Sequence, residues 1–264
     1  MPADLAALLA DLDAETAALR EILEPLPDRD WQLATPAPGW SIGDQVAHLA
    51  YFDDVAVSAA TRPEEFGAIR AGLADGVENP DTIAARYRHL SPAQLRDWFG
   101  RARAELLTTF AGLDPSARVP WFGPPMSVAS SVTARLMETW AHGQDIADTI
   151  GTGREPTARL RHVAHIGVAA LPYSYAAHGQ PVPNVPVRVE LTAPSGEIWT
   201  WGPHGARDCI SGPALDFCLL VTRRRHPADT ALVAVGPVAD QWLSIAQSFA
   251  GPPGAGRLPG QFAR

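Results

Sequence analysis

A helix that carries a glutamate and a histidine one turn apart is the feature that most constrains this chain. Residues 135–145 contain no proline and only one glycine, and their apolar residues recur at helical spacing. Glu138 and His142 therefore project from the same face of the helix, four positions apart. A carboxylate and an imidazole in this arrangement can bind one divalent cation. A third ligand from elsewhere would complete a site with an open coordination position, as in catalytic zinc centres.

The candidate for the third ligand comes from a second short segment. Residues 39–48 read Gly-Trp-Ser-Ile-Gly-Asp-Gln-Val-Ala-His. Ser41 is a typical helix N-cap, with Asp44 three positions later in a capping-box arrangement, so a helix is predicted from 42 to about 60. His48 lies on the flank of the apolar stripe of this helix and is the candidate ligand.

Each of these features also has an ordinary structural explanation. A histidine on an amphipathic helix usually lies at the surface or at the core edge, and Glu–His pairs at this spacing stabilise helices modestly. The stronger zinc motif, H-E-x-x-H, is absent from the sequence. Asp145, one turn after His142, could orient that imidazole through a hydrogen bond, or could be a solvated residue near the helix end.

Hydrophobic periodicity predicts a helical bundle followed by a small mixed domain, an α+β fold class. The expected helices of the first part cover 3–24, 42–60, 63–73, 81–111 with a break at Ser91-Pro92, 127–150, and 156–178 with a kink at Pro172. The second part is expected to contain strands at 185–191, 198–201 and 231–235 and helices at 213–225 and 238–249. The predicted domains are 1–180 and 181–252, and residues 253–264 are predicted to form a flexible tail.

An aromatic, proline-rich loop precedes the helix that carries Glu138. It contains Trp121, Phe122 and Met126, and because it leads directly into that helix it can cover the open side of the site. Together with Trp40 and Phe52, these side chains form the predicted apolar wall of a substrate pocket. The alternative interpretation is that the aromatic residues only close the end of the bundle.

Composition argues against several classes of protein. The net charge of −8 is not that of a general nucleic-acid binder, and no segment approaches the roughly 20 apolar residues of a membrane span. Two cysteines, Cys209 and Cys218, are too few for a disulfide framework, and the first residues do not resemble a signal peptide. We therefore expect a cytoplasmic protein with neither nucleic acid nor membrane as a partner, either a monomer or a dimer.

The two short segments also resemble a known family. Pro-x-Pro-Gly-Trp-Ser at residues 36–41, followed by a helix with Ala-His-Leu, is similar to the DinB/YfiT-like metalloenzymes. Glu138-x-x-x-His142 resembles the branch typified by mycothiol-dependent maleylpyruvate isomerase. The resemblance implies a four-helix bundle whose metal ligands would be His48, Glu138 and His142. The region after 180 resembles the small C-terminal domain of that family, so the similarity covers nearly the whole chain.

The same resemblance implies a function. It implies a divalent metal, zinc before other ions, and the low-molecular-weight thiol mycothiol as a co-substrate. The metal would act as a Lewis acid that lowers the pKa of a bound thiol for attack on an electrophilic carbon. The expected activity is S-transfer to a small electrophile or its isomerisation.

The resemblance also points to one arginine. The family's isomerase uses an arginine from its C-terminal domain, and Arg223 is the best positional match, although Arg224 and Arg225 leave the register open. A guanidinium in this role would bind an anionic group of the substrate.

Two other functions stay open at this point. One is a metal-dependent hydrolase or lyase, in which metal-bound hydroxide replaces the thiolate. The other is a non-catalytic metal- or ligand-binding module, because three ligands and a pocket do not guarantee turnover. Nothing in the sequence specifies the electrophile.

Overall fold

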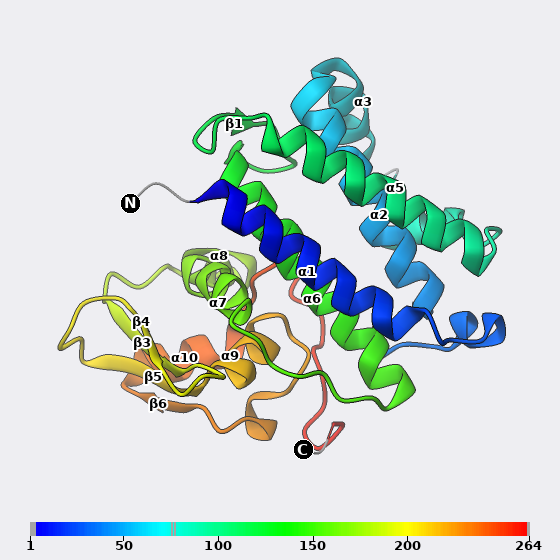
Figure 1. The fold of residues 1–264 in the computed structure, drawn as a ribbon. Coiled ribbons are helices and arrows are strands. Elements are labelled where there is room, and N and C mark those ends of the chain that lie inside the picture. Colours follow the sequence, from blue (N-terminus) through cyan, green and yellow to red (C-terminus); the bar gives the residue numbers. More distant parts are fainter. Residues whose placement is uncertain (1–3, 75, 77, 263–264) are drawn as a thin grey trace. The chain divides into compact units, whose positions relative to one another are not determined.

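The computed structural model describes residues 4–74, 76 and 78–262 (Figure 1). The chain forms two compact units, one that ends at Gly153 and one that begins at Arg154. The first is helical and the second combines helices with a four-stranded sheet, so the predicted α+β class is confirmed. Among the helices of the described ranges, none combines the length and the apolar character needed to cross a membrane.

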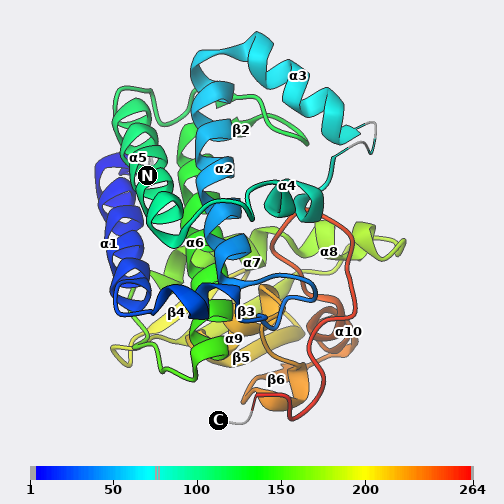
Figure 2. The ribbon, with the colours of Figure 1, turned by 90° about the vertical axis from the view of Figure 1, so that its right-hand side faces the viewer.

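Four long helices build the first unit: α1 (Leu5–Leu23), α2 (Ile42–Thr61), α5 (Pro92–Ala111) and α6 (Val128–Ile150). Helix α2 packs against α5 and α6, and α1 packs against α5 and α6 (Figure 1 and Figure 2). This is the predicted four-helix bundle. Shorter elements connect these helices: η1 (Asp28–Gln32), α3 (Pro63–Ala74), α4 (Pro80–Arg86), β1 (Arg118–Val119) and β2 (Met126–Ser127).

Local sequence signals set the ends of the bundle helices. Ser41 accepts a hydrogen bond from the backbone amide of Asp44, whose carboxylate accepts one from the backbone amide of Ser41, so the predicted capping box is present. Ser91 caps α5 in the same way and Pro92 occupies its first turn, which divides the third predicted helix at the anticipated position. Gly151 ends α6 in the left-handed conformation, at φ 67°.

An ion pair is buried at the centre of the bundle. The Arg103 side chain of α5 is 1% exposed and donates to both carboxylate oxygens of Asp53 of α2, at 2.7 and 3.3 Å. The same guanidinium donates to the hydroxyls of Thr16 on α1 and Thr139 on α6. Arg103 thus links its own helix to the other three, and its donors find partners inside the core.

The second unit is a sheet with strand order β4-β3-β5-β6. Strands β3 and β5 are parallel, and the two outer strands are antiparallel to their neighbours. The strands are β3 (Val187–Thr192), β4 (Ile198–Trp201), β5 (Asp208–Pro213) and β6 (Val233–Val235). The helices are α7 (Leu160–Ala169), α8 (Leu171–Ala177), α9 (Ala214–Val221) and α10 (Pro237–Ile245). Helix α9 packs on β3 and β5, α10 packs on β5 and β6, and α7 packs on α9.

The division after Gly153 differs from the predicted domain limits of 1–180, 181–252 and 253–264. Helices α7 and α8, which the prediction placed with the bundle, pack against α9 and α10. Gly167 of α7 lies so close to α9 that an added Cβ would be 2.7 Å from a methyl group of Val221. The sequence shows that residues 160–177 have an apolar face, but not which unit that face covers.

Other differences concern single elements. Strand β5 was not predicted, because Ser211, Gly212 and Pro213 interrupt its apolar pattern. The helix predicted over 156–178 is two helices, with Pro172 in the first turn of α8. The helix predicted over 213–225 ends at Val221, so Arg223 to Arg225 follow the helix instead of forming its last turn.

Candidate functional site

Three side chains of the first unit converge between α2 and α6. The ligand atoms that His48, Glu138 and His142 offer all lie within 4.8 Å of one another. Oε2 of Glu138 is 3.1 Å from Nε2 of His142 and 3.8 Å from Nε2 of His48. The three side chains are 10–18% exposed, with His142 the least and Glu138 the most. The geometry thus brings together the residues that the helical spacing and the Trp-to-His segment had singled out.

A glutamine that the sequence analysis did not single out orients His142. Nδ1 of His142 donates to the side-chain oxygen of Gln45, and the amide of Gln45 donates to Oγ1 of Thr35 at 2.9 Å. Thr35 in turn donates to the carbonyl oxygen of Trp40 at 2.9 Å. With its proton on Nδ1, His142 turns the lone pair of Nε2 toward Glu138, the tautomer that binding through Nε2 requires. Gln45 could have been found by its position, because it lies three residues before His48 on one helix face.

Asp145 was predicted as the partner that orients His142. The structure gives Nδ1 of that ring Gln45 as its partner, and Asp145 is completely buried on the next turn of α6. A role for Asp145 near the site therefore stays a prediction.

The protonation of the cluster favours cation binding. Burial lowers the pKa of His48 to about 4, with a further contribution from the neighbouring His142, so the His48 ring is neutral at physiological pH. Burial alone would raise the pKa of Glu138. The neighbouring His142 and His48 rings and the charge of Arg135 outweigh burial and hold that pKa well below its usual value. A neutral imidazole and an ionised carboxylate are the forms that bind metals.

Aromatic rings border the cluster. The Trp40 ring stacks on His142 with centroids 5.8 Å apart, and the Phe52 ring lies 4.6 Å from that of His48. Phe52 also contacts the loop before α6: its ring centroid is 6.4 Å from that of Trp121 and 6.0 Å from that of Phe122. A chain of ring contacts therefore runs from this loop to the candidate ligand His48.

Phe66 and Met126 complete the description of this region. Phe66 of α3, which the sequence analysis did not name, stacks on Trp121 at 6.1 Å and extends the aromatic cluster. Met126 begins β2, pairs with Val119 and is half-buried. The place of Met126 in the pocket stays a prediction.

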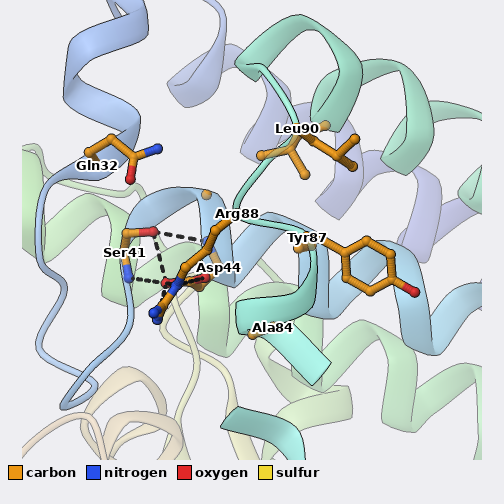
Figure 3. A pocket seen from close by; sticks show the side chains of 10 residues that line it. Gln32, Ser41, Asp44, Ala84, Tyr87, Arg88 and Leu90 are labelled. Atoms are coloured by element: carbon orange, nitrogen blue, oxygen red, sulfur yellow. Dashed lines mark hydrogen bonds and ion pairs between the residues drawn. The ribbon is translucent and has the colours of Figure 1, made fainter. Parts of the chain in front are cut away.

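Polar contacts hold the segment between η1 and α2, which contains Trp40, in place. The indole of Trp40 donates to Asp81 at 2.6 Å, and Arg88 donates to the carbonyl of Gly39 at 2.8 Å and to the carboxylate of Asp44 at 2.9 Å. Figure 3 shows Arg88 and Asp44 beside a small pocket lined by the start of α2 and the segment between α4 and α5. None of the three candidate ligands lines this pocket, so we assign it a structural role in anchoring the loop.

Arg223 belongs to the second unit and adopts an unusual backbone conformation. It follows α9 at φ 60°, and among the described residues it alone has a positive φ without being a glycine. Its amide and that of Arg224 close the helix end by donating to Leu220 and Leu219. Its guanidinium is half-buried, donates to Gly254 at 3.4 Å, and has Nη1 buried without a hydrogen-bond partner in the part of the chain that the structure describes.

Comparisons with known proteins agree with this architecture. A crystal structure of mycothiol-dependent maleylpyruvate isomerase matches with a TM-score of 0.59 at 17% identity, over 88% of this chain and 93% of that one. A mutant of that enzyme with one histidine replaced by alanine matches over the same shares, also at 17% identity, with a TM-score of 0.58. At this identity the likeness shows a shared fold.

The sequence comparisons go further. An uncharacterized protein of Mycobacterium tuberculosis, from the strains H37Rv and CDC 1551, is 45% identical over 260 residues, which is 97% of this chain and 100% of that protein. A family model described as wyosine base formation matches residues 183–235, within the second unit. A model described as the mycothiol maleylpyruvate isomerase N-terminal domain matches residues 12–147, more than half of the chain. The resemblance seen in the motifs is therefore confirmed, and the chain belongs to the mycothiol maleylpyruvate isomerase N-terminal domain family.

Proposed function

We propose that this protein is a thiol-dependent enzyme that isomerises a small electrophilic substrate or transfers a low-molecular-weight thiol to it. We further propose that it uses one divalent metal, zinc before other ions, held by His48, Glu138 and His142. The convergence of these three ligand atoms within 4.8 Å is the observation that carries the proposal. Membership of the family, together with the mycothiol dependence that its structural relatives carry in their name, supports the thiol as co-substrate.

The residues of the site fit such a metal. Two imidazole nitrogens and one carboxylate oxygen are ligands that zinc accepts, and three protein ligands are typical of its catalytic sites. Nδ1 of His48 is buried and has no hydrogen-bond partner among the residues described, an unusual state for a ring nitrogen in a folded protein. The metal, when bound, supplies Lewis acidity that lowers the pKa of a coordinated thiol.

The chain's own residues supply orientation and exclusion of water. Gln45 holds His142 in the tautomer that directs Nε2 toward Glu138. Trp40 stacks on His142, and Phe52, which contacts the loop before α6, packs against His48. A site bordered by aromatic rings strengthens electrostatic interactions, because the effective dielectric is lower there than in water.

Maleylpyruvate, the substrate in the name of the structural relatives, is the first substrate to test. Zinc-loaded protein is incubated with it, with and without mycothiol, and the products are followed by mass spectrometry. Conversion that requires the thiol supports the proposal. Conversion that ignores the thiol points to a hydrolase or lyase, and tight binding without conversion points to a binding module.

Arg223 is our proposed catalytic residue of the second unit. A non-glycine residue at φ 60° carries a strain of about 1–2 kcal/mol, so a side chain kept at such a position is a candidate for function. Arg223→Gly removes the guanidinium and also relieves this strain. We expect unchanged or slightly higher stability to denaturant, and a loss in kcat/KM of about tenfold or more, the cost of a charged hydrogen bond to a substrate anion.

Arg225→Ala is the matched control for Arg223→Gly. It removes a neighbouring guanidinium, one that lies over Phe262, and should leave kcat/KM close to the wild-type value. Equal and negligible effects of the two substitutions would refute the assignment of Arg223.

A further inference from the structure

Arg135 is a buried cation beside the ligand cluster, and the proposed metal binding does not use it. It lies on α6 one turn before Glu138, on the helix face that also carries His142. Its side chain is 6% exposed, and the centre of its guanidinium is 5.9 Å from the centroid of the Phe52 ring. Its charge acts on both Glu138 and His48. The guanidinium thus lies beside both the ligands and the aromatic wall.

One nitrogen of the Arg135 guanidinium is not satisfied by the protein. Nη1 is buried and has no hydrogen-bond partner within the described residues. Nη1 lies 3.9 Å from Oδ1 of Asp53, which is an ion-pair contact but is too long for a hydrogen bond. A buried charged donor without an acceptor is costly, and in native proteins such a group calls for an explanation.

The carboxylates nearby are already engaged. Asp53 accepts from Nε and Nη2 of Arg103 at 2.7 and 3.3 Å, so it does not depend on Arg135 for a counter-charge. Glu138 is 3.1 Å from Nε2 of His142 and 3.8 Å from Nε2 of His48. A divalent cation at the ligands would add two positive charges close to Arg135. The space beside Arg135 and the three ligands then favours binding of an additional anion.

We propose that Arg135 binds a carboxylate of the small electrophilic substrate. A carboxylate offers two oxygens to the planar guanidinium fork, and the neighbouring Phe52 ring keeps water away from the contact. Anchoring a carboxylate here holds the rest of a small molecule beside the ligands on α6. The inference rests on the proposed function for the nature of the substrate, whereas binding of the anion can be measured without turnover.

The test measures binding of maleate, a small dicarboxylate, to the zinc-loaded protein by calorimetry. Arg135→Gln should keep its zinc content and weaken maleate binding by about tenfold or more, with a rise in KM for the substrate. Arg101→Gln, which removes an exposed arginine of α5 and changes the net charge equally, should bind maleate as the wild type does. Where Arg135→Gln fails to fold, Arg135→Lys decides, because it keeps the charge but loses the two-pronged contact. It should bind maleate several-fold more weakly.

Two results would overturn the assignment: no maleate binding by the wild type, or a folded Arg135 variant whose affinity stays within about twofold of the wild-type value. The failure of the proposed function looks different. Maleate binding that depends on Arg135, in a protein without thiol-dependent turnover, would leave the anion site in place and remove the proposed reaction. Thiol-dependent turnover with maleate binding indifferent to Arg135 would remove only the anion site.

Discussion

Replacing His142 by alanine is expected to abolish zinc binding and thiol-dependent turnover together. A three-residue site that loses one ligand should lose more affinity than the roughly 10–100-fold that follows loss of a hydrogen-bond partner behind a ligand. Zinc content after a chelator wash, measured by elemental analysis, checks this. The variant should also unfold at lower denaturant concentration than the zinc-loaded wild type, because a metal bound only to the native state stabilises it.

Two further variants provide reference values for the loss of zinc binding. His89→Ala removes an exposed imidazole of the same unit and should leave the zinc content unchanged. Gln45→Ala removes the partner of Nδ1 of His142 and should weaken zinc binding by about 10–100-fold, between the two other variants. Near-stoichiometric zinc in His142→Ala after the chelator wash would contradict the site.

Removal of Arg103 is expected to produce the largest loss of stability. Arg103→Met leaves the buried Asp53 without its hydrogen-bonded partner, and breaking a buried pair in this way costs about 3–5 kcal/mol. Thr16 and Thr139 also lose the donor that they share. The free energy of unfolding from urea denaturation measures the effect.

Two controls distinguish the effect of breaking the buried ion pair from the effect of losing one arginine. Arg101→Met changes an exposed position two residues earlier on α5 and should stay within about 0.5 kcal/mol of the wild type. Arg103→Met combined with Asp53→Leu removes both charges and should recover part of the loss, because no uncompensated carboxylate remains. A loss below about 1 kcal/mol for Arg103→Met alone would show that the pair contributes little.

The sequence predicted the parts of the site that depend on local spacing. Glu138 and His142 could be placed on one face because four positions make one helical turn, and Ser41 with Asp44 fixes the start of the helix that carries His48. The association of His48 with the other two needed more than spacing. It came from the resemblance to a family, because nothing local indicates which helices become neighbours.

What the sequence did not reveal depends on packing between distant segments. Gln45 contacts His142 across 97 positions of the chain, and Phe66 of α3 stacks on Trp121 of the loop before α6. That Nη1 of Arg135 has no hydrogen-bond partner follows from the fold, in which Asp53 accepts its hydrogen bonds from Arg103. The same holds for residues 160–177, whose apolar face is evident locally although its partners, α9 and α10, follow much later.

The central claim is that the metal held by His48, Glu138 and His142 binds and activates a thiol. Cobalt(II) in place of zinc makes this visible, because a thiolate sulfur bound to cobalt gives a charge-transfer absorption in the near ultraviolet. The account predicts that mycothiol produces this absorption in the cobalt-loaded wild type, saturating at one thiol per metal, and that His142→Ala shows none. A cobalt spectrum that stays unchanged when the thiol is added would contradict it.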